Sequence, residues 1–189
     1  MRKVRLLITS LILFCSTTLM VNAYETVLVD FPPKEVWKAV LHQQQNSEAI
    51  LQYVPKGQSS QNWTRTLIFH SYKKNGLFNF SDAKQLINTL TAQLEYQNNS
   101  AEYRYVKYDG ADSIAVRCVN GNSYVPTQCE ILRTTMSYEG IMSMHYINKD
   151  TKSFKSEYPK WLYIVRHIKI YRSYFRDNRV MDKELNYEI

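Results

Sequence analysis

The stretch that decides the fold lies in the second half of the chain and reads SIAVRCV (113–119), CEILRTTMSY (129–138) and IMSMHYI (141–147). The three segments are rich in β-branched, aromatic and other apolar residues, and polar or turn-forming residues separate them. Asp109-Gly110 is a strong hairpin signal before the first segment, and Glu139-Gly140 is a weaker one between the last two. The pattern predicts consecutive antiparallel strands.

The rest of the chain predicts helices packed on this sheet. Together they make a single α+β domain over 24–181, an antiparallel sheet covered by two or three helices, followed by a C-terminal tail over 182–189. With 44% hydrophobic and 22% charged residues, the composition is that of an ordinary globular protein and excludes collagen-like, disordered and multi-span membrane classes. Four further strands are expected at 24–29, 50–54, 65–72 and 102–108.

The clearest helix is expected at 82–96, because Ser81 is a good N-cap and apolar residues form one stripe with Leu90, expected to be fully buried, near its centre. A second helix is predicted over 33–45, where apolar residues recur at helical spacing after two prolines. The segment 158–175 matches helical spacing and also the alternation of a strand. We predict a helix there, because 18 residues are long for a strand.

Residues 1–23 have the layout of a secretory signal peptide, with basic residues, then an apolar segment, then small residues at Val21-Asn22-Ala23. The alternative is an uncleaved membrane anchor, since the 16 residues of 6–21 approach the shortest length that spans a bilayer. Cleavage would remove three basic and no acidic residues, lowering the formal net charge from +7 to +4. We expect an exported protein, periplasmic or extracellular.

Two cysteines remain after such a cleavage, Cys118 and Cys129. An even pair in an oxidising compartment predicts a disulfide, with two free buried thiols as the alternative. No histidine lies between them to complete a metal site, and their spacing is not that of a Cys-x-x-Cys redox pair.

Motifs that carry chemistry are absent from the sequence: it has no nucleophile elbow, zinc-binding helix, P-loop or dinucleotide fingerprint. We therefore expect no catalytic residue, no cofactor and no metal ligand. Glu102, Glu130 and Glu139 are interpreted as strand charges, although a carboxylate pair can act as acid and base where a fold brings it together. Four histidines far apart in the sequence are interpreted as structural residues: His42, His70, His145 and His167.

The most polarised segment is 152–179, with eight basic residues, two acidic ones and interleaved tyrosines. On a helix, Lys169, Arg172 and Arg176 would follow i, i+3, i+7 spacing and share a face. Such a surface would bind an anionic membrane or an acidic protein; the alternative is a solvated face that keeps the protein soluble. We expect a monomer and no nucleic-acid partner. The candidate binding surface comprises Lys160, Arg166, Lys169, Arg172 and Arg176.

A local motif runs Tyr53-Val54-Pro55-Lys56-Gly57 and, five residues later, Trp63-Thr64. It resembles a pattern in small exported bacterial proteins of unknown function, Tyr-[Ile/Val]-Pro-x-Gly followed by Trp-[Ser/Thr]. The resemblance implies a compact exported α+β domain, broadly similar to PsbP-like folds, and implies no activity. We therefore predict an exported binding or interaction protein without a catalytic site, with type II secretion as one route out of the cell. The alternative is a small secreted hydrolase whose site converges only in the fold.

Overall fold

In a computed structural model of the protein, the described residues are 24–45, 48–74, 80–98, 103–176 and 179–184. The expected signal peptide lies outside these ranges. Two helices are formed within them, α1 (Ala83–Gln97) and α2 (Thr151–Arg166). The strands are β1 (Tyr24–Leu28), β2 (Trp37–Gln45), β3 (Glu48–Pro55), β4 (Arg65–Lys73), β5 (Arg104–Lys107), β6 (Asp112–Val119), β7 (Gln128–Met136), β8 (Gly140–Asn148), β9 (Lys169–Arg176) and β10 (Arg179–Glu184).

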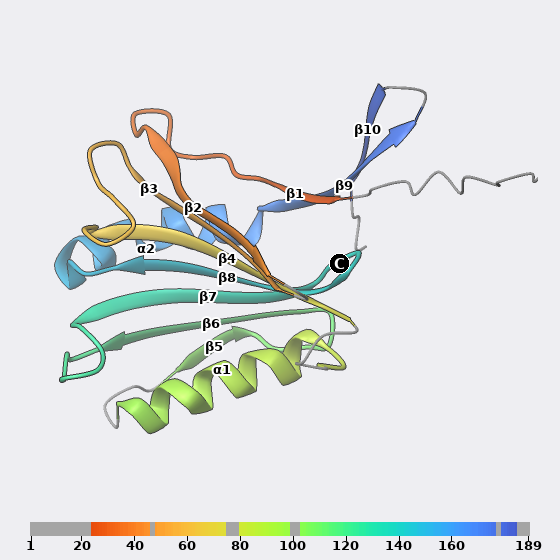
Figure 1. Cartoon of the computed structure of the whole chain (residues 1–189). Helices are drawn as coiled ribbons and strands as arrows, with labels where there is room; N and C mark the ends of the chain where they lie inside the picture. The colour runs from red at the N-terminus through yellow and green to blue at the C-terminus, as the bar shows by residue number, and fades with distance from the viewer. Residues whose placement is uncertain (1–23, 46–47, 75–79, 99–102, 177–178, 185–189) are drawn as a thin grey trace, which may run out of the picture.

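These strands form two antiparallel sheets (Figure 1). The larger sheet has the order β2-β3-β4-β8-β7-β6-β5, and the smaller one has the order β1-β9-β10. Figure 1 shows the β9–β10 hairpin projecting away from the large sheet. The tail expected over 182–189 begins as strand, because β10 continues to Glu184 and pairs with β9; residues 185–189 lie outside the described chain.

The expectation of an α+β sheet covered by two or three helices is wrong, because the described chain is mostly β. One helix packs on each face of the large sheet, α1 on one side and α2 on the other (Figure 1). Neighbouring residues of a strand point to opposite faces. On β7, Leu132 accordingly packs with Ile87 of α1, while Ile131 lies in the cluster that contains Trp161 of α2.

The helix predicted over 33–45 is wrong, because its residues from Trp37 on form β2. This strand pairs antiparallel with β3, and the register shifts by one residue between Ala39 and Leu41. Such a bulge interrupts the two-residue alternation of a strand, so the apolar residues recur at a spacing that resembles a helix. Val36, which the helical reading places on a buried face, is 63% exposed.

The helix predicted over 158–175 is wrong in its second half, where α2 ends at Arg166 and the chain turns into β9. Arg133 of β7 explains the end of the helix. Its Nη1 donates to the carbonyl oxygens of Val165 at 2.8 Å, Arg166 at 3.1 Å and Ile168 at 3.1 Å. Two of these carbonyls would accept from the next turn if the helix continued, so the guanidinium replaces that turn.

The helix predicted over 82–96 is confirmed as α1, with Asp82 rather than Ser81 as its N-cap. The Asp82 carboxylate accepts from the backbone N–H of Gln85 at 2.8 Å. The apolar stripe packs on the sheet, but Leu90 is only partly buried, in contrast to the full burial expected for it. The fully buried residues of this helix are Ala83, Leu86 and Ile87.

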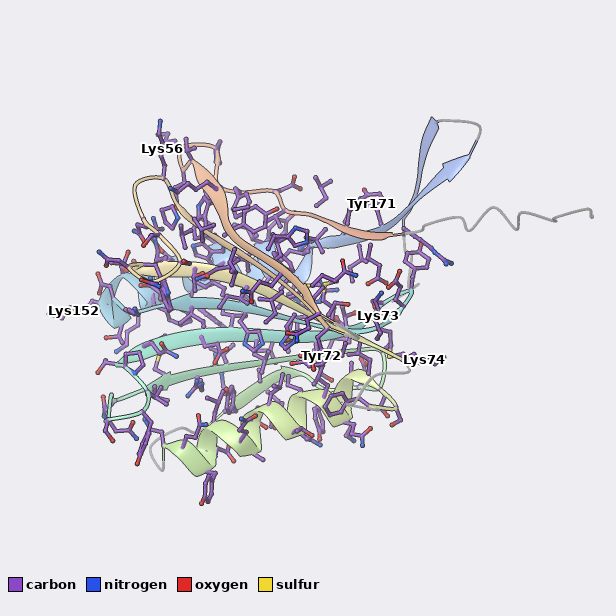
Figure 2. The ribbon with its side chains drawn as sticks, viewed as in Figure 1. Lys56, Tyr72, Lys73, Lys74, Lys152 and Tyr171 are labelled. Carbon is purple, nitrogen blue, oxygen red and sulfur yellow. A yellow bond between two sulfur atoms is a disulfide. The ribbon has the colours of Figure 1, made fainter. Side chains whose placement is uncertain are left out.

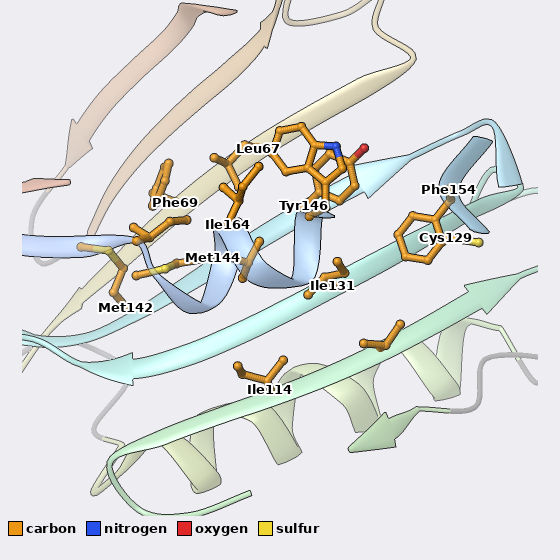
Figure 3. Close-up of a cluster of buried hydrophobic side chains, with 14 of the residues drawn as sticks. Leu67, Phe69, Ile114, Cys129, Ile131, Met142, Met144, Tyr146, Phe154 and Ile164 are labelled. Carbon is orange, nitrogen blue, oxygen red and sulfur yellow. The ribbon is translucent and has the colours of Figure 1, made fainter. Parts of the chain in front are cut away.

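The main core lies between the large sheet and α2 (Figure 3). Tyr146 of β8 stacks on the fully buried Trp161 of α2, with ring centres 3.9 Å apart. Trp37 of β2 meets the same indole edge-on at 5.1 Å. Large aromatic side chains therefore fix α2 against both the centre and the β2 edge of the sheet.

The predicted disulfide is present between Cys118 of β6 and Cys129 of β7. The two residues are direct partners in the strand register, with Cα atoms 4.0 Å apart. The bridge therefore ties the ends of two adjacent strands across the loop that joins them. A structural disulfide fits an oxidising, exported location.

Candidate functional site

A groove of about 540 Å³ lies between β1 and the strands β2, β3 and β4 of the large sheet. Its volume falls within the range of roughly 300–1,000 Å³ found for small-molecule sites. Figure 3 shows two of its lining residues, Phe69 and Met142, at the end of the core cluster away from Phe154. The apolar side of the lining comprises Val27, Ala49, Ile50, Leu51, Tyr53, Phe69 and Met142.

The bulge in β2 directs two polar side chains into the groove. Before the bulge Ala39 opposes Tyr53, and after it His42 opposes Leu51. Directly opposed residues share a face of the sheet. The extra residue therefore turns His42 and Gln44 toward the groove, and both line it. Without the bulge, this strand would present Leu41 on that side.

One end of the groove is charged. The Nζ of Lys73 lies 3.2 Å from a carboxylate oxygen of Glu139. The Glu25 carboxylate accepts from the backbone N–H of Glu139 at 2.8 Å, which ties β1 to the turn between β7 and β8. Burial raises the pKa of Glu25, while hydrogen bonds from this turn oppose the rise. Two carboxylates and one ammonium thus meet at this end.

A second polar cluster lies on the opposite face of the large sheet. Tyr72 and Lys73 are labelled at the end of β4 in Figure 2, and as strand neighbours they point to opposite faces. Tyr72 accordingly belongs to a chain of hydrogen bonds on the α1 face, which runs across β3, β4, β8 and β7. Its members are Glu48, His70, Tyr72, Ser143, His145 and Glu130.

The distances along this chain are short. His145 Nδ1 lies 2.6 Å from Glu130 Oε1, and His145 Nε2 lies 2.9 Å from Ser143 Oγ. The Ser143 side chain hydrogen-bonds the Tyr72 hydroxyl, which lies 2.9 Å from His70 Nδ1. His70 Nε2 lies 2.7 Å from Glu48 Oε2. The fold therefore joins two histidine–carboxylate pairs through two hydroxyls.

Glu130 is fully buried and stays ionised because of its partners. Burial alone would raise its pKa, but the hydrogen bond and charge of His145 and the charge of Arg117 lower the pKa of Glu130 to about 2. The Nε of Arg117 donates to Glu130 at 2.9 Å, and the Tyr103 hydroxyl donates to the same oxygen at 3.3 Å. The Arg117 guanidinium also lies over the Tyr103 ring, 5.2 Å from its centre.

The other end of the chain is more open to solvent. The side chains of His70 and Glu48 are 22% and 29% exposed. Burial lowers the pKa of His70, and the hydrogen bond with Glu48 opposes that change. Burial raises the pKa of Tyr72 to about 12, so that its hydroxyl keeps its proton at neutral pH.

The five basic residues of the candidate binding surface are divided between two elements. Lys160 and Arg166 lie on α2, whereas Lys169, Arg172 and the backbone of Arg176 lie on β9. Strand residues three apart point to opposite faces. Lys169 and Arg172 therefore do not share a face, which corrects the predicted spacing. The side chain of Arg176 lies outside the described residues.

The four described side chains of this set are exposed. Lys160 Nζ pairs with a Glu35 oxygen at 3.0 Å, and the Arg172 guanidinium lies 5.8 Å from the centre of the Tyr138 ring. An exposed ion pair contributes little to stability. The role of this set as a binding surface stays a prediction.

Sequence reasoning misses both the groove and the hydrogen-bonded chain. His70 and His145 meet only because β4 and β8 are neighbours in the sheet, with Ile68 opposing His145. Glu130 reads as a strand charge, and the only sequence signal against that interpretation is its place between Cys129 and the apolar pair Ile131-Leu132. Among the described residues, no group of three or more His, Cys, Asp or Glu is placed to hold a metal ion. Neither helix of the described chain is long and apolar enough to cross a membrane.

No family model, curated protein or solved structure matches the chain. The resemblance of the segment from Tyr53 to Thr64 to exported bacterial proteins therefore stays a prediction. The local geometry of that segment follows the residues: β3 ends at Pro55, and Gly57 adopts a positive φ of 93°. The function has to be argued from the chain's own groove and side chains.

Proposed function

We propose that this chain is an exported binding protein whose groove between β1 and β2–β4 takes a single-chain amphiphile with an uncharged polar head. The observation that supports the proposal is the groove itself, about 540 Å³ in volume, apolar along most of its lining and charged at one end. Burying an alkyl chain against such a lining is favourable by about 25 cal/mol for each Å² of apolar surface removed from water.

The charges at one end of the groove favour an uncharged head group. An anionic head would meet the carboxylates of Glu25 and Glu139, and a cationic head would compete with the ammonium of Lys73 for Glu139. An uncharged head with hydroxyls can accept from Lys73 and donate to Glu139 without separating the ion pair. His42 and Gln44 supply further hydrogen-bonding groups along the β2 wall.

The location that we propose for this protein is the periplasm or the extracellular space, reached after cleavage behind Ala23. The Cys118–Cys129 disulfide supports an oxidising compartment. Cleavage at that bond would leave β1 whole, because the strand begins at Tyr24 and supplies one wall of the groove. Type II secretion of the folded, disulfide-bonded protein is a route that suits this order of events.

Calorimetric titration of the mature chain, residues 24–189 with the disulfide intact, tests the proposal. The probes are octyl glucoside, octyl sulfate and octyltrimethylammonium, each below its micelle concentration, and the glucoside should bind most tightly. Ala49→Trp places a large side chain in the groove and should weaken glucoside binding by about tenfold or more, equivalent to about 1.4 kcal/mol. Ala92→Trp, on the exposed side of α1, is the matched control and should bind as wild type does. No binding of any probe, or equal loss in both variants, would contradict the proposal.

A second candidate is a small hydrolase, which one observation favours: Ser143, His145 and Glu130 are hydrogen-bonded in the order of a nucleophile, a base and its orienting acid. Two observations oppose it. Ser143 is fully buried, and neither His70 nor His145 lines the groove or either of two smaller cavities in the described part of the chain. Hydrolysis of p-nitrophenyl acetate that is lost in Ser143→Ala would support the hydrolase over the binding protein.

A further inference from the structure

In the hydrogen-bonded chain on the α1 face, the number of available hydrogens can be compared with the number of hydrogen bonds. It contains five hydrogen bonds, from Glu130 through His145, Ser143, Tyr72 and His70 to Glu48. Each bond needs one hydrogen. Ionised carboxylates supply none, each hydroxyl supplies one, and each neutral imidazole supplies one. Two hydroxyls and two neutral histidines therefore supply four hydrogens, which leaves one bond unmade.

A fifth proton completes the chain, because it converts one imidazole into an imidazolium that donates from both nitrogens. With the proton on His145, Ser143 donates to Tyr72, and Tyr72 donates to His70. With the proton on His70, both hydroxyls are reversed: Tyr72 donates to Ser143, and Ser143 donates to His145. Both arrangements satisfy all five bonds, and the transfer of one proton along each of the three bonds between the two imidazoles interconverts them.

The charges around the hydrogen-bonded chain also favour the binding of one proton. Glu48 faces it from β3 and Glu130 from β7, while Arg117 of β6 pairs with Glu130. Tyr103, which precedes β5, donates to Glu130, and the charge of Glu95 on α1 acts on this tyrosine. Two carboxylates, one guanidinium and one imidazolium add to zero net charge. Because the side chains of Arg117 and Glu130 are buried, such neutrality is favoured.

We propose that His70 and His145 share one bound proton through the hydroxyls of Tyr72 and Ser143, and titrate as a single unit. A second proton is resisted for two reasons. It would place two like charges on one chain, and both imidazoles would then donate toward hydroxyls that already carry hydrogens. The two protons therefore bind in separate macroscopic steps, and each step belongs to the pair rather than to one histidine.

The hydroxyl of Tyr72 is the link that makes this sharing possible. Without it the chain divides into a longer fragment, Glu130–His145–Ser143, and a shorter one, His70–Glu48. The longer fragment has a pair of hydrogens for its pair of bonds, and the shorter fragment has a single hydrogen for its single bond. Neutral histidines then suffice on both sides, and no shared proton is needed. Tyr72→Phe tests the proposal while keeping the aromatic ring that stacks on His70 at 4.1 Å.

The experiment is an NMR titration of the imidazole signals of His70 and His145 in the mature, disulfide-bonded chain. In wild type, both rings should respond in both steps. In Tyr72→Phe, each ring should show one step of its own, and the first proton should bind about tenfold more weakly, a fall of one pKa unit. Ser143→Ala interrupts the series of hydrogen bonds at the neighbouring hydroxyl. It should give the same result if the Tyr72→Phe variant does not fold. Tyr103→Phe removes a hydroxyl that contacts Glu130 outside the chain, and it should keep both rings responding together. Independent single-step titrations in wild type, or unchanged titrations in both chain-breaking variants, would overturn the proposal.

Discussion

Replacing Glu130 by glutamine should change both the stability of the protein and its dependence on pH. The carboxylate is 2% exposed and is held by Arg117, whose side chain is 1% exposed. Glu130→Gln leaves that guanidinium buried without its counter-ion. Removing one partner of a buried ion pair costs about 3–5 kcal/mol. We therefore expect a loss of unfolding free energy of this order at pH 7.

The dependence on pH follows from the lowered pKa of Glu130. Its fall from 4.5 to about 2 corresponds to about 3 kcal/mol, since one pKa unit is about 1.4 kcal/mol. Because the native pKa is the lower one, this contribution is fully present above the unfolded value of 4.5 and is lost as the pH falls toward 2. Below pH 4.5, the stabilities of wild type and Glu130→Gln should therefore converge by up to about 3 kcal/mol.

Urea unfolding at several pH values from 7 to 3 measures this difference. Subtracting the two curves cancels the titration of every group that the substitution does not affect. Glu95→Gln, at an exposed position of α1, is the control and should follow wild type throughout. A gap between wild type and Glu130→Gln that stays constant from pH 5 to pH 3 would refute the reasoning.

Three further predictions concern processing, the disulfide and the helix on the sheet. N-terminal sequencing of the exported protein should start at Tyr24, whereas a membrane-bound form that keeps residue 1 would contradict cleavage. Joint substitution of Cys118 and Cys129 by serine opens a loop worth about 3 kcal/mol in the chain-entropy model and should lower the Tm by several degrees; native cysteines that react with a thiol label would argue against the bridge. Leu86→Ala, at a fully buried site, should cost about 2–5 kcal/mol in denaturant unfolding, and the partly buried Leu90→Ala clearly less; the reverse order would mean that the packing of α1 is wrong.

The sequence predicted β1, the six strands from β3 to β8 and the helix α1, because local periodicity and turn residues determine these elements. The sequence-based prediction failed where a side chain distant in sequence, or an irregular strand pairing, determines the secondary structure. The helix α2 ends where the guanidinium of Arg133, on β7, hydrogen-bonds its last carbonyl groups. No residue within the segment 158–175 indicates this contact. The bulge at Val40 likewise depends on the pairing of β2 with β3, and it disguises a strand as a helix.

The candidate sites could not be predicted from the sequence for a similar reason, because the fold brings together residues that are distant in sequence. The groove joins β1, from the start of the described chain, to β4 and β8, so its lining is not continuous in sequence. His70 and His145 are neighbours only after the sheet has formed. The disulfide, in contrast, followed from cysteine count and compartment alone, because those properties do not depend on the detailed fold.

The methionine methyl groups give the most direct measurement of the proposed binding site. Met142 lines the groove, while Met136 lies against α1 on the other side of the sheet. With ¹³C-methyl methionine in the mature chain, titration with octyl glucoside below its micelle concentration should shift the Met142 signal in a saturable manner. The Met136 signal should stay in place. A Met142 signal that does not move, or equal shifts of both signals, would contradict the claim that this protein binds an amphiphile between β1 and β2–β4.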